Sequence, residues 1–326
     1  KKSLLLNPDE ADPHNNLGNA YNETGHIGEA INNFKKSILI DDKNPKANYH
    51  YGILLYQLGH HENAIIHFEK TDFDLSHSYL LRCLYFLNQQ TRFYTYLDSL
   101  IAKGKNDAVI GSLCNRANKE FGIPRPNPFC ADPLSYVLVK SLENEYNFSE
   151  VFIEPSINLL NDKNTNIMPQ SLLENGIQTA GNIFNINSTN TTKMLKIIDF
   201  ELQEYFEFYK DSEEGFIKNW PKDYLISGWL IKMKNGGELK SHMHEKGWIS
   251  GSIYVNVPPQ THREGGNLVV SVTNEEHSPQ ETVSTRKEIH VATGSLCLFP
   301  SSLQHYTTPF NSSQDRIVLA FDLIAK

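Results

Sequence analysis

Cysteines and long apolar runs are both scarce in this chain of 326 residues. The four cysteines lie far apart and form no Cys-x-x-Cys pair, which suits neither a disulfide framework nor a zinc knuckle. No uninterrupted apolar run approaches the ~20 residues of a membrane-spanning helix, and no signal-peptide pattern opens the chain. Because unpaired thiols are typical of a reducing compartment, we expect a soluble cytoplasmic protein.

An excess of positive charge is also missing. Thirty basic side chains stand against 38 acidic ones, which gives a net charge of −8. Surfaces that coat nucleic acid or anionic membranes are usually basic, so we expect neither of these partners. Hydrophobic residues make up 39% and charged residues 21%. This composition and length predict a folded chain of one large or two ordinary domains.

The first hundred residues contain a repeat with a period of 34 residues. Leu17, Gly18, Gly25, Ala30, Ile31 and Phe34 recur as Tyr51, Gly52, Gly59, Ala64, Ile65 and Phe68. The small residues allow two antiparallel helices to approach, the phenylalanines fill the gap between hairpins, and Pro45 is expected to end the second helix. This order resembles the tetratricopeptide repeat, which implies binding of an extended peptide or protein. A spacer or a dimerisation surface is the alternative.

Both ends of the repeat region depart from the pattern. Residues 1–7 align with residues 35–41, again 34 apart, so we expect the chain to start within a repeat, with further repeats upstream. A third hairpin, at about 76–103, keeps the apolar spacing without the glycines and is expected to cap the stack. Residues 1–103 are therefore assigned to the repeats. Residues 104–133 are assigned to a helix (108–121) and a proline-rich connector, and residues 134–326 to a second domain.

Short runs with a period of two dominate the second domain. They lie near 225–233, 249–257, 268–272, 288–291, 295–299 and 317–323, separated by turns such as Gly236-Gly237. This pattern predicts an antiparallel sandwich or barrel. A helix is expected at 193–209, after an Asn-rich loop at 182–192.

Histidines near these runs are candidate metal ligands. His242 and His244 would project to the same side of a strand, where two imidazoles can chelate a metal ion, although such a pair also arises by chance on solvated strands. His305 follows a later strand and turn. Arg316 opens the final strand, where small neighbours leave room for an inward guanidinium that could bind a carboxylate. Tyr254, on the strand face of Ser250, Ser252 and Asn256, could hydrogen-bond a bound ligand or could be a core tyrosine.

Three segments, 237–255, 294–305 and 316–322, resemble the 2-oxoglutarate/Fe(II)-dependent oxygenases, whose members frequently carry tetratricopeptide repeats. The resemblance implies an α+β multidomain chain, in which helical hairpins precede a double-stranded β-helix (jelly-roll) with supporting helices. It implies Fe(II) on His242, His244 and His305, and 2-oxoglutarate on Arg316. Such an enzyme would consume O₂, release succinate and CO₂, and hydroxylate a peptide, protein or small molecule.

Some alternatives stay open at this point. Well-studied oxygenases of this kind have an aspartate where this chain has His244, and Glu245 could replace it only if the strand bends. An all-histidine dioxygenase that does not use 2-oxoglutarate, and a non-catalytic repeat protein with a relic barrel, are the competing functions. The histidines at 262, 277 and 290 are expected at the surface, and the tryptophans at 229 and 248 in packing roles.

Overall fold

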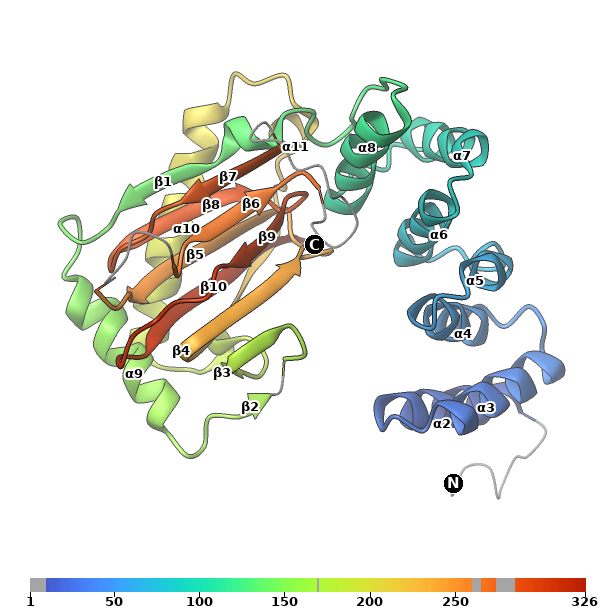
Figure 1. The fold of residues 1–326 in the computed structure, drawn as a ribbon, viewed down its shortest axis with the longest axis horizontal. Helices are drawn as coiled ribbons and strands as arrows, with labels where there is room; N and C mark the ends of the chain where they lie inside the picture. The colour runs from blue at the N-terminus through green and yellow to red at the C-terminus, as the bar shows by residue number, and fades with distance from the viewer. Residues whose placement is uncertain (1–9, 169, 260–264, 274–284) are drawn as a thin grey trace. The chain divides into compact units, whose positions relative to one another are not determined.

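The chain divides into two compact units, Lys1–Lys105 and Asn106–Lys326 (Figure 1). The computed structural model describes residues 10–168, 170–259, 265–273 and 285–326. The predicted repeat end at residues 1–7 lies outside these ranges. Among the described helices, none combines the length and the apolar composition that crossing a membrane requires.

The first unit consists of helical hairpins. Its helices are α2 (Ala11–Glu23), α3 (Ile27–Ile40), α4 (Pro45–Gln57), α5 (His61–Phe68), α6 (Asp74–Phe86) and α7 (Gln90–Ala102). A Cβ atom at Gly18 would lie 2.7 Å from the ring of Phe34, and one at Gly52 would lie 2.7 Å from the ring of Phe68. The glycines of the repeat are therefore required where a phenylalanine of the second helix packs against the first.

Pro45 begins a helix rather than ending one. Helix α3 ends at Ile40, and Pro45 is the first residue of α4. The Asn44 side chain caps α4 by accepting a hydrogen bond from the Ala47 amide at 2.9 Å. Proline suits this first position because the amide that it lacks would have no partner within the helix. The expectation for Pro45 was therefore wrong.

The third hairpin keeps the geometry of the turn without its glycine. Gly25 and Gly59 have φ angles of 75° and 76°, and Asn88 has a φ of 52° at the corresponding place. Asparagine tolerates this left-handed conformation better than most residues. The loss of sequence similarity in α6 and α7 therefore leaves the hairpin intact.

The second unit is a β domain with supporting helices. Its helical segments are α8 (Ala108–Phe121), η1 (Pro133–Tyr136), η2 (Ser149–Ile153), α9 (Glu154–Asn161), η3 (Ile183–Asn185), α10 (Thr189–Tyr209) and α11 (Gly215–Lys218). Its strands are β1 (Leu138–Ser141), β2 (Ile167–Met168), β3 (Leu173–Thr179), β4 (Tyr224–His242), β5 (Ile249–Asn256), β6 (Leu268–Ser271), β7 (Arg286–Ile289), β8 (Ser295–Pro300), β9 (Gln304–Thr307) and β10 (Arg316–Ala325).

These strands form one antiparallel sheet in the order β1-β8-β5-β10-β4-β9-β6-β7, and β3 also pairs with β4. The predicted fold class, helical hairpins followed by a jelly-roll β domain, is confirmed. Strands β1, β2, β3 and β9 were not predicted. The Asn-rich segment is more ordered than expected, since it contains η3 and the start of α10, which Ser188 caps.

Strand β4 is twice as long as predicted because Gly236-Gly237 lies within it. Gly236 has a φ of 72°, which glycine adopts without strain. Before the glycines β4 pairs with β10, and after them it pairs with β9, with a register shift between Leu239 and His242. The glycine pair therefore bends one strand across two parts of the sheet instead of separating two strands.

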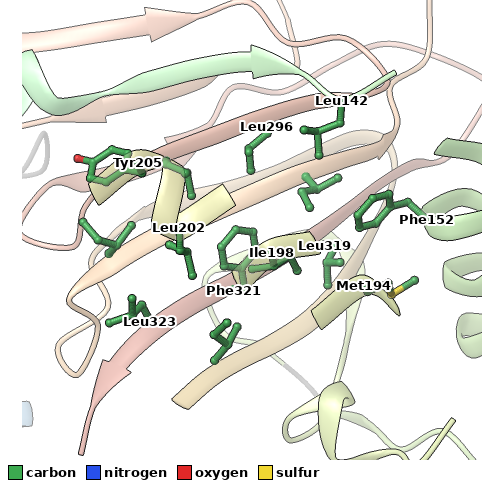
Figure 2. Packing of buried hydrophobic residues seen from close by; sticks show 14 of the residues in the cluster. Leu142, Phe152, Met194, Ile198, Leu202, Tyr205, Leu296, Leu319, Phe321 and Leu323 are labelled. Atoms are coloured by element: carbon green, nitrogen blue, oxygen red, sulfur yellow. The ribbon is translucent and has the colours of Figure 1, made fainter. Parts of the chain in front are cut away.

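The main core lies between the sheet and α10. Figure 2 shows Ile198 and Leu202 of α10 close to Leu319 and Phe321 of β10. Leu319 and Phe321 occupy alternate positions of β10, so the residues between and beside them face the other side of the sheet. Val318 is one of these, and it lines the cavity described next. The two faces of β10 thus separate the packing core from the candidate site.

Candidate metal centre

Three imidazoles converge at the end of β4. His242 is the last residue of β4 and lies directly opposite His305 of β9 in the register of the two strands. Their ring centroids are 4.3 Å apart, and the ring of His244 lies 4.7 Å from that of His305. One nitrogen atom of each histidine lies within 4.8 Å of the other two. The three side chains can therefore reach a single ion.

His244 reaches the cluster in a different way from that predicted. Strand β4 ends at His242, so His244 belongs to the connection to β5 and not to a regular strand. The simple rule that residues i and i+2 face the same side does not account for its position. A hydrogen bond from its Nδ1 to Asp322 of β10 holds the His244 side chain in place.

Hydrogen bonds fix the orientation of two of the imidazoles. Nδ1 of His242 lies 2.8 Å from the carbonyl oxygen of Lys240, and Nδ1 of His244 lies 2.7 Å from Oδ1 of Asp322. Both partners can only accept, so each Nδ1 carries a proton and each Nε2 presents a lone pair. These two Nε2 atoms are 3.3 Å apart. Two acceptors at that distance fit around a cation, and imidazole nitrogen suits Fe, Zn, Cu and Ni ions.

Burial keeps the imidazoles in the form that binds metals. Burial, and secondly the proximity of His244, lowers the pKa of His242 to about 4. The pKa of His305 lies well below its usual value, first because of burial and then because of His242 and His244. The neutral form of His242 and His305 therefore dominates at neutral pH, and neutral imidazole is the metal ligand.

A cavity of about 330 Å³ adjoins the imidazoles. Its walls include the apolar side chains of Ile231, Leu239 and Phe299, together with Trp229 and Tyr254. The Trp229 ring lies edge-on to His244, with centroids 5.2 Å apart. Trp229 thus contributes to the cavity wall and not only to packing. The cavity therefore combines the three imidazoles with a mainly apolar wall.

Arg316 contacts Tyr254, which lines this cavity, but is not itself one of the lining residues. Its side chain is 1% exposed, and Cζ lies 5.1 Å from the centroid of the Tyr254 ring. Nη1 donates to the carbonyl oxygen of Gly266, whereas Nε and Nη2 are buried without a partner in the described part of the chain. Burial raises the pKa of Tyr254 well above its usual value, so the phenol stays protonated. A buried guanidinium with two unused donors fits a carboxylate that binds through both oxygens.

Comparisons with known proteins show which families two parts of this chain resemble. Residues 227–322 match the family model described as "Putative 2OG-Fe(II) oxygenase", and residues 18–59 match the TPR repeat. The first range contains the three histidines, Tyr254 and Arg316. The likeness to this family is confined to that range, which spans 96 of the 326 residues. No curated protein matches the chain.

The solved structures that match parts of this chain include two prolyl hydroxylases and the protein pilF. A prolyl-4-hydroxylase from Pseudomonas putida has 12% identity and a TM-score of 0.43, over 58% of this chain and 92% of that one. A Trichoplax adhaerens prolyl hydroxylase, solved with a hypoxia inducible factor peptide, has 11% identity and a TM-score of 0.41, over 65% and 89%. Pseudomonas aeruginosa pilF has 18% identity and a TM-score of 0.33, over 37% and 58%. Because all three TM-scores are below 0.5, these structures carry no argument about the function of this chain.

Glu245 does not belong to the group of side chains that could share one ion. Among the described residues, that group consists of His242, His244 and His305. Glu245 follows His244 in a turn.

Two residues that contact His244 were not predicted from the sequence to belong to the site. Asp322 and Ser250 are paired across β10 and β5, and both are buried. The alternation that places Arg316, Val318 and Ala320 on one face of β10 continues to Asp322, so the strand pattern contained this signal.

The remaining predicted surface and packing residues can also be placed. His290 is exposed, whereas His262 and His277 lie outside the described residues. The indole nitrogen of Trp248 donates to the Phe216 carbonyl oxygen at 2.8 Å, and its ring packs against Phe129. Trp248 therefore has the expected packing role.

Proposed function

We propose that this protein is an Fe(II)- and 2-oxoglutarate-dependent hydroxylase whose iron is held by His242, His244 and His305. The observation that carries the proposal is the pair of Nε2 lone pairs of His242 and His244, 3.3 Å apart and close to His305. The family of residues 227–322 supports Fe(II) as the ion and 2-oxoglutarate as the cosubstrate.

Each side chain of the site has a distinct task in this proposal. Arg316 binds the distal carboxylate of 2-oxoglutarate through Nε and Nη2, the two donors without a partner in the described residues. The phenol of Tyr254 donates a hydrogen bond to the same molecule from the cavity wall. The Lys240 carbonyl oxygen holds the Nδ1 proton of His242, so its Nε2 stays free to bind the ion.

When bound, Fe(II) supplies the oxidative chemistry in which 2-oxoglutarate, O₂ and a C–H group give succinate, CO₂ and a C–OH group. The chain contributes binding, orientation and exclusion of water. The apolar walls formed by Ile231, Leu239 and Phe299 keep bulk water from the imidazoles.

The acceptor in this proposal is a peptide or protein, with a small molecule as the other class. The tetratricopeptide repeat at residues 18–59 supports a polypeptide, because stacked repeats present extended surfaces to chains. Location in the cytoplasm stays a prediction. It is supported by four buried cysteines, none of which forms a disulfide.

The decisive experiment adds Fe(II) and 2-oxoglutarate to the protein without oxygen and records the visible charge-transfer band of the iron–keto acid chelate. The sample is then exposed to air, and succinate is measured. We expect both signals from the natural protein and neither from His305→Ala. His290→Ala is the matched control, because this histidine is exposed and outside the cluster. Absence of both signals from the natural protein would refute the proposed function.

A further inference from the structure

Asp322 is a buried carboxylate next to the candidate metal centre. Its side chain is 8% exposed, and its Oδ1 accepts hydrogen bonds from His244 Nδ1 at 2.7 Å and from Ser250 Oγ at 2.8 Å. Within the described residues, His244 is its only potential ion-pair partner. Asp322 is therefore connected to the ion site through a single imidazole.

The surroundings of Asp322 hold it in this orientation. Ser301 Oγ lies 2.8 Å from Ser250 Oγ, which completes a chain of hydrogen bonds from Ser301 through Ser250 to Asp322. A Cβ atom at Gly247 would lie 2.5 Å from Ser301 Oγ and 3.2 Å from Asp322 Oδ1. The glycine thus leaves space for the carboxylate and the two hydroxyls beneath the turn that contains His244.

The charge balance of this arrangement needs an explanation. Burying a carboxylate costs several kcal/mol unless a positive charge compensates it, and an imidazole that binds a metal ion is neutral. The three proposed ligands are also all neutral, so a divalent ion bound to them keeps its full charge. A carboxylate and a divalent ion on opposite nitrogens of one imidazole compensate each other, as in carboxylate–histidine–metal arrangements.

We propose that Asp322 is a positioning residue for the metal centre. It keeps the Nδ1 proton of His244 on the far side from the ion, and it supplies, one imidazole away, the negative charge that an aspartate ligand would bring directly. This inference rests on the proposed function, because it requires an ion on the three histidines.

Co(II) alone is the probe for the test, added to the metal-free full chain and followed by its visible absorption. Asp322→Asn keeps the size of the side chain and removes its charge, and we expect Co(II) affinity to fall about 10- to 100-fold. Ser250→Ala keeps the charge and removes one hydrogen bond, so the loss should be smaller, about fivefold.

Glu201→Gln is the matched control. Glu201 is also a buried carboxylate of the second unit, but it pairs with Lys140 and Tyr146 on the α10 side of the sheet. We expect this variant to bind Co(II) as tightly as the natural protein. Thermal melting of each variant without metal checks that it is folded. Glu201→Gln should melt lower than the natural protein, because Lys140 loses its buried partner.

The outcomes distinguish this inference from the proposed function. Unchanged Co(II) affinity in Asp322→Asn, with normal binding by the natural protein, overturns the role of Asp322 alone. Failure of the natural protein to bind Co(II) overturns both proposals. If Asp322→Asn does not fold, Ser250→Ala decides: unchanged affinity in that variant overturns the inference, and a fivefold loss supports it.

Discussion

Replacing Arg316 with methionine should remove the response of the protein to 2-oxoglutarate while changing its own stability little. The guanidinium is 1% exposed, and its Nε and Nη2 donors have no partner in the described residues. Methionine is of similar length and flexible enough to fill the space. The substitution therefore removes a buried charge without leaving a large cavity.

In Arg316→Met, the free energy gained by removing a buried charge and the free energy lost with its contacts nearly cancel. Two buried donors without partners cost about 2–6 kcal/mol at about 1–3 kcal/mol each, and the substitution relieves this cost. It also removes the hydrogen bond to Gly266 and the contact with the Tyr254 ring. The hydrogen bond contributes about 1.5–3 kcal/mol, and the contact with the ring contributes about 1–2 kcal/mol. We expect the unfolding free energy of the ligand-free protein to change by less than about 2 kcal/mol.

The stabilisation of the protein by 2-oxoglutarate should change far more than the stability of the ligand-free protein. At 100 times its Kd, 2-oxoglutarate stabilises the native protein by about 2.7 kcal/mol, which raises the melting temperature of a domain of this size by about 5–11 °C. Loss of a buried charge pair costs at least about 2–5 kcal/mol of binding. If the Kd rises 100-fold, the same concentration stabilises by only about 0.4 kcal/mol.

The assay is thermal melting with Mn(II), with and without 2-oxoglutarate, in the natural protein and in Arg316→Met. Arg286→Met is the control, because this arginine is exposed on β7 of the same unit, and it should retain the full shift. A ligand-induced shift of natural size in Arg316→Met would refute the role of Arg316. Destabilisation of the ligand-free variant by more than about 4 kcal/mol would refute the view that two donors lack partners.

Three further predictions concern stability, each measured on the full chain. Gly52→Ala should destabilise by about 1–3 kcal/mol, because the new methyl group would lie 2.7 Å from the Phe68 ring. Phe68→Leu in the same chain should recover part of the loss, and strictly additive effects would contradict this. Burial, and secondly Lys70, lowers the pKa of His67 from 6.5 to about 4. The unfolded chain therefore binds this proton first as the pH falls from 6.5 to 4, and stability should drop with it, by roughly 1 kcal/mol after allowing for partial exposure. Urea unfolding should show a weaker pH dependence in His67→Gln, and equal slopes would contradict the shift. Finally, a chelator should lower the melting temperature of the metal-loaded protein and leave His305→Ala unaffected, and an equal effect on both would argue against the site.

The sequence predicted the features that depend on local pattern. The 34-residue period located the hairpins, and the alternation in β10 placed Arg316 opposite the packing face. Features that depend on long-range pairing were missed or misread. Gly236-Gly237 reads locally as a turn, and only pairing with both β10 and β9 makes it a bend within β4. The role of Asp322 is of the same kind, because its contact with His244 joins residues 78 positions apart.

The bend in β4 has a consequence for the reach between the two halves of the site. Met233 of β4 pairs with Arg316, and His242 of the same strand pairs with His305. The backbone from residue 233 to residue 242 therefore sets the spacing between the guanidinium and the imidazoles. Adding one residue at Gly236-Gly237 would increase that spacing, and we expect such a variant to prefer dicarboxylates of another chain length.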